Sequence, residues 1–377
     1  MSKIELHIQP KNLWLTQDVP CIISGPCSVE SPEQIRDTAK KLSQNSRVST
    51  LRGGIWKPRT RPNSFEGVGE IGLKWLKEAG DEVGLPVATE VATSRHVELC
   101  LKHNIDVLWI GARTTVNPFS VQEIAEVLKG TDIPVLIKNP INPDINLWIG
   151  AIERINSVGI TKIGAIHRGF SSFDKTAYRN APMWEIPIEL KMLCPELPIL
   201  CDPSHISGNR ELIKSISQKA LDLELDGLMI ETHFNPEIAL SDAKQQLTPH
   251  QLSIVLSQLT FRDKQSSNEN VVNRLEQLRQ VIDELDEDLL NKFASRMDVI
   301  EKIGKYKKEN NITILQLDRW EQTLKNRLFI AEKAGLNADF TKKLLELVHQ
   351  ESIRIQVEVM NETNPKAAIK ISDKNFE

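Results

Sequence analysis

Eight short apolar segments, separated by stretches with helical periodicity, constrain this chain more than any other feature. Most of them are continuously apolar, as expected of strands that are buried on both faces. A chain that repeats strand and helix in this way is expected to form a parallel sheet covered by helices. The segments span residues 20–26, 49–55, 86–90, 107–112, 134–139, 162–168, 198–203 and 227–233.

The number of strand–helix units and the length that they occupy indicate a closed barrel. Eight such units within residues 1–262 match the size of a (β/α)8 barrel. A doubly wound open sheet is the alternative, but no Gly-x-Gly-x-x-Gly turn follows the first predicted strand. We therefore predict an α/β fold in which residues 1–262 form a (β/α)8 TIM barrel.

The hydrophobic period changes after a polar segment at 263–270, which we predict to be a linker. From 271 to 308, apolar residues recur every three or four positions, the spacing of a long amphipathic helix. Two shorter helices are predicted near 316–334 and 339–359. Residues 271–360 are thus predicted to form a separate all-α three-helix domain, followed by a disordered tail at 361–377.

The long predicted helix has more apolar surface than two shorter helices can cover. Intertwining with a second copy of the domain would cover the whole stripe. A coiled-coil or solvent-bridging appendage is the alternative. We therefore expect a homodimer, or a higher homo-oligomer, assembled through the helical domain.

Composition narrows the functional class. The 377 residues are 40% apolar and 26% charged, with a net charge of −4, so neither a disordered chain nor a nucleic-acid-binding basic surface is indicated. No run of about 18 apolar residues predicts a membrane span, and the N-terminus lacks a signal-peptide pattern. The five cysteines form no Cys-x-x-Cys pair, which favours a reduced, cytoplasmic protein.

Each predicted strand ends near a charged or metal-binding residue. In a barrel of this class the active site lies at the C-terminal ends of the strands. A single residue of this kind is usually a surface charge or a small buried side chain. Eight of them, one at the end of each predicted strand, are hard to explain as solvated surface. Five cations converging on one mouth need anionic ligands such as phosphate or carboxylate. They are Arg52, Arg59, Arg113, Lys138 and Arg168.

A second group at the same rim combines one thiol, one imidazole and two carboxylates. This donor set suits one divalent transition metal with an open position for substrate. The sequence leaves manganese, iron, zinc and cobalt open. Two further histidines near the rim, His167 and His233, are open to either a structural or a functional interpretation. The four candidate ligands are Cys27, His205, Glu231 and Asp242.

The order of the motifs on successive strands resembles the 3-deoxy-arabino-heptulosonate 7-phosphate (DAHP) synthases. The likeness covers residues 10–260 and is closest to the compact subfamily related to 3-deoxy-manno-octulosonate 8-phosphate synthase. The motifs are GPCSVE (25–30), LRGG (51–54), KPRT (57–60), GART (111–114), IKNP (137–140), HRGF (167–170), DPSH (202–205) and IETHFNPEIALSD (230–242).

This resemblance implies an aldol-type transferase that condenses phosphoenolpyruvate with erythrose 4-phosphate. It implies the four ligands above for the metal, and Arg52, Arg113, Lys138 and Arg168, with Glu90 nearby, for phosphoenolpyruvate. It further implies Lys57, Arg59 and Thr60 for erythrose 4-phosphate, with Lys57 as a plausible proton carrier. The octulosonate enzymes resemble one another in having Asn-Arg-Ser-Ser-like residues where this chain has Lys-Pro-Arg-Thr, so arabinose 5-phosphate is the less favoured alternative.

Residues 271–357 resemble the all-helical chorismate mutases without a gap, which implies rearrangement of chorismate to prephenate. Arg296 and Lys307 are eleven residues apart, about three helical turns, and therefore share a face. Ser352 and Gln356 do so at a spacing of four. Arg296, Lys307 and Gln356 are the expected catalytic residues. The site that the resemblance implies comprises Arg279, Arg296, Lys307, Arg319, Ser352 and Gln356.

One departure keeps a second interpretation of the helical domain open. Gln316 and Trp320 stand where many of these mutases have acidic residues that hold the substrate hydroxyl. The domain is therefore either an active mutase or a module that senses chorismate or prephenate, or only dimerises the chain. Where it binds chorismate or prephenate, we expect that ligand to inhibit the barrel, a coupling between distinct sites.

Overall fold

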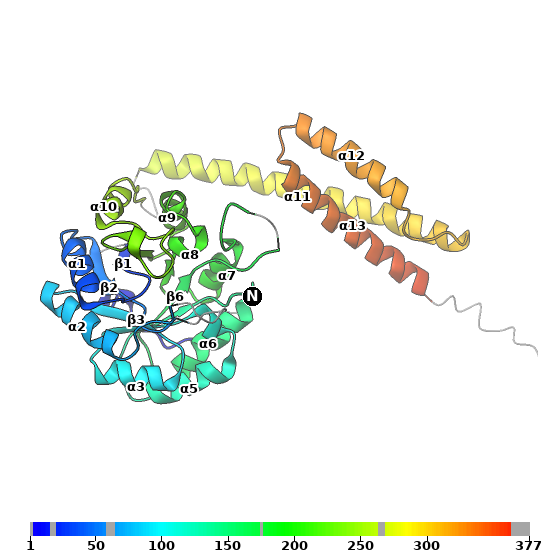
Figure 1. Ribbon diagram of the computed structural model, residues 1–377. Coiled ribbons are helices and arrows are strands. Elements are labelled where there is room, and N and C mark those ends of the chain that lie inside the picture. Colours follow the sequence, from blue (N-terminus) through cyan, green and yellow to red (C-terminus); the bar gives the residue numbers. More distant parts are fainter. Residues whose placement is uncertain (1–2, 16–19, 58–64, 174–175, 263–267, 363–377) are drawn as a thin grey trace, which may run out of the picture. The chain divides into compact units, whose positions relative to one another are not determined.

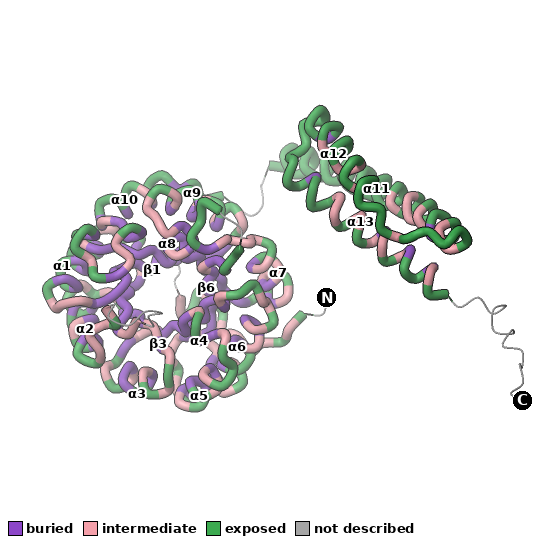
Figure 2. The backbone as a smooth tube through the Cα atoms, turned by 45° about the vertical axis from the view of Figure 1, so that its right-hand side comes forward, coloured by how far each residue is buried: buried purple, intermediate pink, exposed green. Residues whose placement is uncertain are grey.

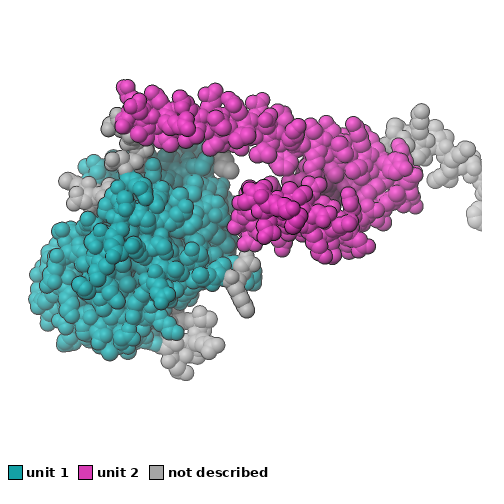
Figure 3. Space-filling view, turned by 90° about the horizontal axis from the view of Figure 1, so that it is seen from above, with its two compact units in different colours: residues 1–264 teal, residues 265–377 magenta. Residues whose placement is uncertain are grey.

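The computed structural model describes residues 3–15, 20–57, 65–173, 176–262 and 268–362. The chain divides into two compact units, Met1–Lys264 and Gln265–Glu377 (Figure 3).

Eight parallel strands of the first unit close into a barrel in the order of the sequence, β1 to β8. Closure is made by β1 and β8, where Gly25 pairs with Glu231. The predicted (β/α)8 barrel is therefore confirmed. The strands are β1 (Cys21–Gly25), β2 (Val48–Arg52), β3 (Val87–Val91), β4 (Val107–Ile110), β5 (Val135–Lys138), β6 (Ile163–His167), β7 (Ile199–Cys201) and β8 (Gly227–Glu231).

Helices surround the strands and cover the outer face of the sheet (Figure 1). Polar N-cap residues begin many of them: the side chains of Ser31 and Thr93, for example, accept backbone N–H bonds of the first turn. The helices and helical turns are η1 (Lys11–Leu13), α1 (Pro32–Leu42), α2 (Ile71–Val83), α3 (Ser94–Lys102), α4 (Ala112–Thr115), α5 (Pro118–Leu128), α6 (Ile145–Ser157), α7 (Glu185–Leu193), α8 (Pro203–Ser207), α9 (Ile213–Asp222), η2 (Pro236–Ile238) and α10 (Pro249–Ser257).

The strands separate two apolar layers, both purple in Figure 2. The larger layer lies between the strands and the helices and includes Ile22, Leu51 and Val87. The smaller one fills the interior of the barrel, so the barrel is a packed core and not a pore. Its buried members are Cys21, Ile23, Ala88, Trp109, Leu136, Ile166, Leu200 and Met229.

The described residues of the second unit form three helices, α11 (Glu269–Glu309), α12 (Leu317–Lys333) and α13 (Ala338–Asn361). The first begins two residues earlier than predicted, within the expected linker. Helix α13 packs against both α11 and α12. Asn311 and Gly335, which follow α11 and α12, adopt positive φ angles of 55° and 74°. Within the described ranges, no helix has the combined length and apolarity of a bilayer span.

Candidate functional sites

The two-residue period of the strands explains why polar side chains gather at one end of the barrel. Side chains two residues apart on a strand point to the same face. The inward-facing Ala88, Leu136 and Met229 are therefore followed, on the same face and at the C-terminal end of each strand, by Glu90, Lys138 and Glu231. By the same rule Arg168 and Asp202 follow Ile166 and Leu200, just beyond β6 and β7.

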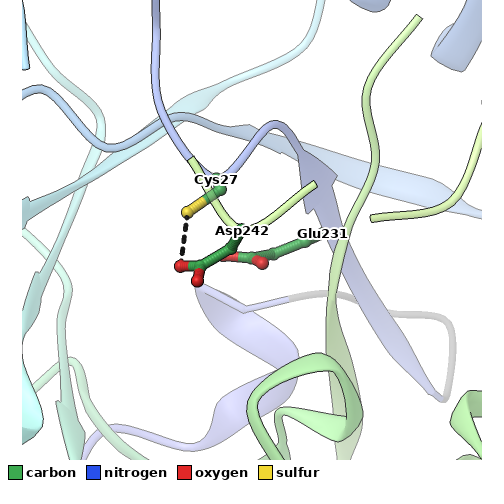
Figure 4. A group of neighbouring side chains, drawn as sticks. All are labelled: Cys27, Glu231 and Asp242. Carbon is green, nitrogen blue, oxygen red and sulfur yellow. Dashed lines mark hydrogen bonds between the residues drawn. The ribbon is translucent and has the colours of Figure 1, made fainter. Parts of the chain in front are cut away.

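Three of the four predicted metal ligands lie together at this end of the barrel. The Cys27 sulfur and one carboxylate oxygen each from Glu231 and Asp242 all lie within 4.8 Å of one another. Figure 4 shows the thiol directed at the Asp242 carboxylate, with Glu231 beside it. The thiol donates a hydrogen bond to Asp242 Oδ2 over 3.2 Å.

His205 lies next to this group. Its Nε2 is 3.8 Å from Glu231 Oε1, and its Nδ1 is 2.8 Å from the Asp202 carboxylate. Asp202 thus lies against one ring nitrogen and the other is turned towards Glu231, an arrangement in which a second carboxylate can orient a histidine ligand. Asp202 also caps α8 by accepting the His205 backbone N–H.

Burial and neighbouring charges shift the pKa values of the three clustered side chains. Burial, together with the negative charge of Glu231, raises the pKa of the Cys27 thiol to about 12. Burial opposes ionisation of Asp242 as well, but His205 and Arg179 outweigh it and hold the pKa of that carboxyl below its usual range. The pKa of Glu231 is lowered against burial by His205 and Arg52. The surrounding charges therefore favour ionised carboxylates at Glu231 and Asp242, whereas burial and Glu231 oppose ionisation of the thiol.

Arg52 is buried, with an exposed fraction of 1%, and only part of its guanidinium is satisfied. Its Nη2 donates to Glu231 Oε1 over 3.3 Å, whereas Nε and Nη1 have no hydrogen-bond partner among the described residues. Unpaired buried donors are costly. A bound carboxylate or phosphate is the kind of group that would satisfy them.

The inner face of β4 supplies an aromatic floor that the sequence analysis did not identify. The Trp109 ring centroid lies 4.9 Å from the Arg52 guanidinium carbon and 5.7 Å from Lys138 Nζ. Its indole N–H donates to Glu90 Oε2 over 3.0 Å. A Cβ at Gly111 would overlap the Glu90 carboxylate, so a larger residue at this strand end would displace that carboxylate.

The remaining predicted cations of the rim differ in exposure. Lys138 is buried and donates to Asp202 Oδ2 over 2.8 Å. Arg168 donates to Asn180 Oδ1 over 2.9 Å; burial, offset in part by Asp202, lowers the pKa of its guanidinium to about 10. Arg113 is exposed in α4, and its charge also acts on Arg168.

Lys57 lies beside the metal-ligand cluster. A Cβ at Gly54 would come within 2.7 Å of the Cys27 carbonyl oxygen and 2.9 Å of Lys57 Nζ. The glycine therefore lets the ammonium approach the backbone at Cys27. Burial alone would lower the pKa of Lys57, but Cys27 and Glu231 raise it above its ordinary value. The predicted Arg59 and Thr60 lie outside the described residues.

Two side chains that the sequence analysis missed connect the cluster to its surroundings. Arg179 donates to Asp242 Oδ1 over 3.0 Å and to Gln245 Oε1 over 2.9 Å. Gln245 in turn donates to Glu231 Oε2 over 2.6 Å. Arg179 lies in the loop between β6 and α7, far along the sequence from the end of any strand. The periodicity of the strands therefore could not predict its place in the site.

In the helical unit, the structure brings together three of the six predicted residues. Arg296 Nη1 donates to the Ser352 hydroxyl over 2.6 Å, joining α11 to α13. Gln356, one turn further along α13, donates to the Ser352 carbonyl over 3.1 Å, and its Oε1 is buried without a partner among the described residues. A Cβ at Gly304 would lie 3.3 Å from Gln356, so a glycine here allows α11 and α13 to approach closely.

The other three residues are less closely associated in a single chain. Lys307 donates to the Ile314 carbonyl over 2.6 Å, and Arg319 is exposed on α12. Arg279 is exposed and pairs with Glu276 over 3.4 Å. It precedes Arg296 by 17 positions on α11, about 25 Å at 1.5 Å per residue. One copy of the domain therefore does not unite Arg279 with Arg296.

Two family models match the chain. The DAHP synthetase I family matches residues 5–266, and chorismate mutase type II matches residues 278–357.

Known proteins resemble the barrel region. A phospho-2-dehydro-3-deoxyheptonate aldolase of Thermotoga maritima is 39% identical over 226 residues, covering 60% of this chain and 64% of the relative. A solved structure of the same-named enzyme from that organism shares 36% identity with a TM-score of 0.57, covering 63% of this chain and 67% of that one. A 2-dehydro-3-deoxyphosphooctonate aldolase of Wolinella succinogenes is 27% identical, covering 63% of this chain and 97% of its own length.

The first family model spans well over half of the chain, and its motifs lie on the strands that form the candidate site. Residues 278–357 include all six predicted mutase residues and lie in the helical unit. This chain therefore belongs to the DAHP synthetase I family and carries a C-terminal region that matches the type II chorismate mutases.

Proposed function

We propose that the barrel condenses phosphoenolpyruvate with erythrose 4-phosphate to give DAHP and inorganic phosphate, with one divalent metal ion. The observation that carries this proposal is the pairing of a thiol–carboxylate cluster with a buried, partly unsatisfied Arg52 at the same strand ends. The heptonate aldolase of Thermotoga, at 39% identity, supports the same reaction.

The donor set fits a divalent metal. Cys27, Glu231 and Asp242 offer ligand atoms within 4.8 Å of one another, and we propose His205 Nε2 as the fourth ligand. When bound, the ion would polarise the aldehyde carbonyl of erythrose 4-phosphate. Thiolate, imidazole and carboxylate together suit manganese, iron, zinc or cobalt.

The cations of the rim would bind and orient phosphoenolpyruvate. Arg52, Lys138 and Arg168 lie at the end of the barrel interior, and the charge of Arg113 acts on Arg168, so phosphate and carboxylate would each find a guanidinium or ammonium partner. Glu90, held by Trp109, would lie near the same substrate. Fixing both reactants in register removes much of the entropic barrier to their condensation.

In the proposed reaction, carbon 3 of phosphoenolpyruvate bonds to the aldehyde carbon. Water then adds at carbon 2, and the carbon 2–oxygen bond to phosphate breaks. Lys57, half-buried beside Cys27, would deliver the proton that the aldehyde oxygen gains. Arg59 and Thr60, in the same motif, would hold the phosphate of erythrose 4-phosphate.

Metal removal tests the barrel proposal. Enzyme treated with EDTA should release no phosphate from the two substrates, and manganese, iron, zinc or cobalt should restore release. Cys27→Ala should lower the metal affinity by about 10-fold or more, the usual effect of disturbing a metal site. Cys100→Ala, which removes another buried cysteine, should bind metal as the wild type does. Full turnover of the EDTA-treated enzyme would contradict the proposal.

The aldose is tested in the same assay. The Lys-Pro-Arg-Thr segment favours erythrose 4-phosphate, whereas the likeness to an octonate aldolase at 27% identity keeps arabinose 5-phosphate as the alternative. A higher kcat/KM with arabinose 5-phosphate would reverse this choice.

We propose that the helical domain rearranges chorismate to prephenate. Arg296 and Arg319 would clamp the two carboxylates, with Arg279 contributed by the partner subunit of a homodimer. Lys307 and Gln356 would donate hydrogen bonds to the ether oxygen as its bond breaks, and Ser352 holds Arg296 in place. A preorganised donor to developing charge is worth about 2.7–4 kcal/mol.

Chorismate consumption by the full-length protein tests the mutase proposal. Wild-type enzyme should convert chorismate to prephenate, and Arg296→Ala should lower kcat/KM by about 100-fold or more, as loss of one such charged donor does. Absence of turnover in a protein whose barrel is active would instead support the alternative, a sensing or dimerising module. All proposed substrates are small metabolites. We therefore propose a cytoplasmic location and no nucleic-acid or membrane partner.

A further inference from the structure

Two aromatic side chains of the helical unit stack against each other. Trp320 of α12 and His349 of α13 have ring centroids 3.8 Å apart, with their planes inclined by 11°. Both side chains are half-buried. A stack of this geometry fixes the imidazole plane and leaves the two ring nitrogens at its edge.

His349 lies on the face of α13 that carries the other predicted site residues. It precedes Ser352 by three positions and Gln356 by seven, and residues at these spacings lie on one face of a helix. Ser352 binds Arg296 of α11 directly. Burial, followed by the charge of Arg296, lowers the pKa of His349, so the imidazole also lies within the electrostatic reach of this arginine.

The imidazole has unused hydrogen-bonding capacity. Among the described residues, neither nitrogen of His349 has a hydrogen-bond partner, and the contacts of this side chain are the stack and the charge of Arg296. A neutral imidazole offers one donor and one acceptor. A half-buried ring held in one orientation beside a cation is therefore prepared to bind a polar group of a ligand.

Chorismate has one polar group that the proposed roles leave without a partner. The arginines match its two carboxylates, and Lys307 and Gln356 match its ether oxygen. Its ring hydroxyl remains. The indole of Trp320 offers only an N–H donor, and Gln316 is exposed at the N-terminus of α12.

We propose that His349, oriented by its stack on Trp320, hydrogen-bonds the ring hydroxyl of chorismate and so makes the helical domain specific for a hydroxylated substrate. This inference rests on the proposed mutase or chorismate-binding function. Trp320 acts as a positioning residue, because it contacts the imidazole and offers no acceptor of its own.

The test compares chorismate with 4-deoxychorismate, which lacks the hydroxyl, in the full-length protein. His349→Phe keeps a ring for the stack but removes both nitrogens. It should lower kcat/KM for chorismate about tenfold, the effect of one lost hydrogen bond, and leave kcat/KM for 4-deoxychorismate within about twofold. His349→Gln, which keeps polar atoms, should recover part of the preference. Gln350→Phe, an exposed neighbour on α13, should change neither value.

A purely structural role for His349 gives a different result. Equal losses on both substrates, or no loss on either, would overturn the proposal, and the melting temperature of each variant shows whether the helices remain folded. If the wild type binds chorismate without turning it over, the mutase proposal fails, and the same comparison is made by calorimetric titration. Absence of both turnover and binding in the wild type would overturn both proposals.

Discussion

At the residue scale, His167 differs from the site residues next to it because its side chain points to the opposite face of strand β6. On β6, Ile166 faces the barrel interior, so His167 faces outward, and its ring packs 5.1 Å from Trp184 and 5.8 Å from Phe170 between centroids. Both of its nitrogens are buried without a hydrogen-bond partner among the described residues. Burial, reinforced by the charge of Arg168, lowers the pKa of His167 to about 3.

This depressed pKa predicts a specific acid sensitivity. Above pH 6.5 the imidazole is neutral in both the folded and the unfolded chain. Between pH 6.5 and about 3 only the unfolded chain binds the proton, so stability falls by about 1.4 kcal/mol per pH unit, or about 2 kcal/mol at pH 5. His167→Phe should lose about this much less stability than the wild type when the pH falls from 7.5 to 5, measured by urea unfolding of the barrel.

A histidine of different environment serves as the control. His250 is exposed on α10, and His250→Phe should keep the acid sensitivity of the wild type. Equal losses of stability in His167→Phe and the wild type would show that His167 is not the titrating group.

At the element scale, α11 is longer than the helices available to cover it. It has 41 residues, whereas α12 has 17 and α13 has 24. Every residue from 268 to 292 is exposed in the single chain, including the apolar series at Leu278, Ile282 and Leu285. Because this stripe continues the period of the half-buried residues that begin at Phe293, we propose that a second copy of the domain covers it.

Charging the stripe should therefore break the dimer. Ile282 and Leu285 have exposed fractions of 55% and 57% in the single chain. Each would contribute about 1.5–3 kcal/mol if it were buried at an interface, so Ile282→Glu with Leu285→Glu should convert the dimer to a monomer in sedimentation experiments. Chorismate turnover should fall with it, since Arg279 would no longer reach a partner.

The polar side of the same helix offers a matched control. Asp283→Lys with Glu284→Lys changes two exposed neighbours and should leave the dimer intact. A monomeric wild type, or an unchanged mass for the doubly charged variant, would refute the proposed interface.

At the scale of the whole molecule, one chain carries two units with different hydrophobic periods, a barrel of strands and helices and an all-helical unit. The barrel gathers its polar residues at strand ends, whereas the helical unit gathers them on helix faces. The proposed product of the barrel enters a pathway several steps before chorismate, so direct transfer of an intermediate is a weak reason for the fusion. Inhibition of the barrel by a ligand of the helical domain is a better one.

Prephenate should therefore inhibit DAHP formation. Coupling between sites typically changes affinity by about 5- to 150-fold, so KM or turnover of the barrel should respond clearly to a saturating ligand. Arg296→Ala should escape this inhibition, because it weakens the ligand's site. The coupling hypothesis fails if barrel turnover stays constant over a wide range of prephenate concentration.

The sequence by itself determined the elements and their order, because hydrophobic period is a local property that survives in any compact arrangement. It predicted eight buried strands, a long amphipathic helix and the strand ends that carry Cys27, Arg52 and Glu231. Arg59 and Thr60 lie beyond the described residues, and the roles of all these residues stay predictions.

Only the tertiary structure decided which side chains meet. Arg179 reaches Asp242, Trp109 underlies Arg52, and Trp320 stacks on His349. Such contacts join residues far apart in sequence, and their geometry depends on loops and helix packing that no periodicity encodes.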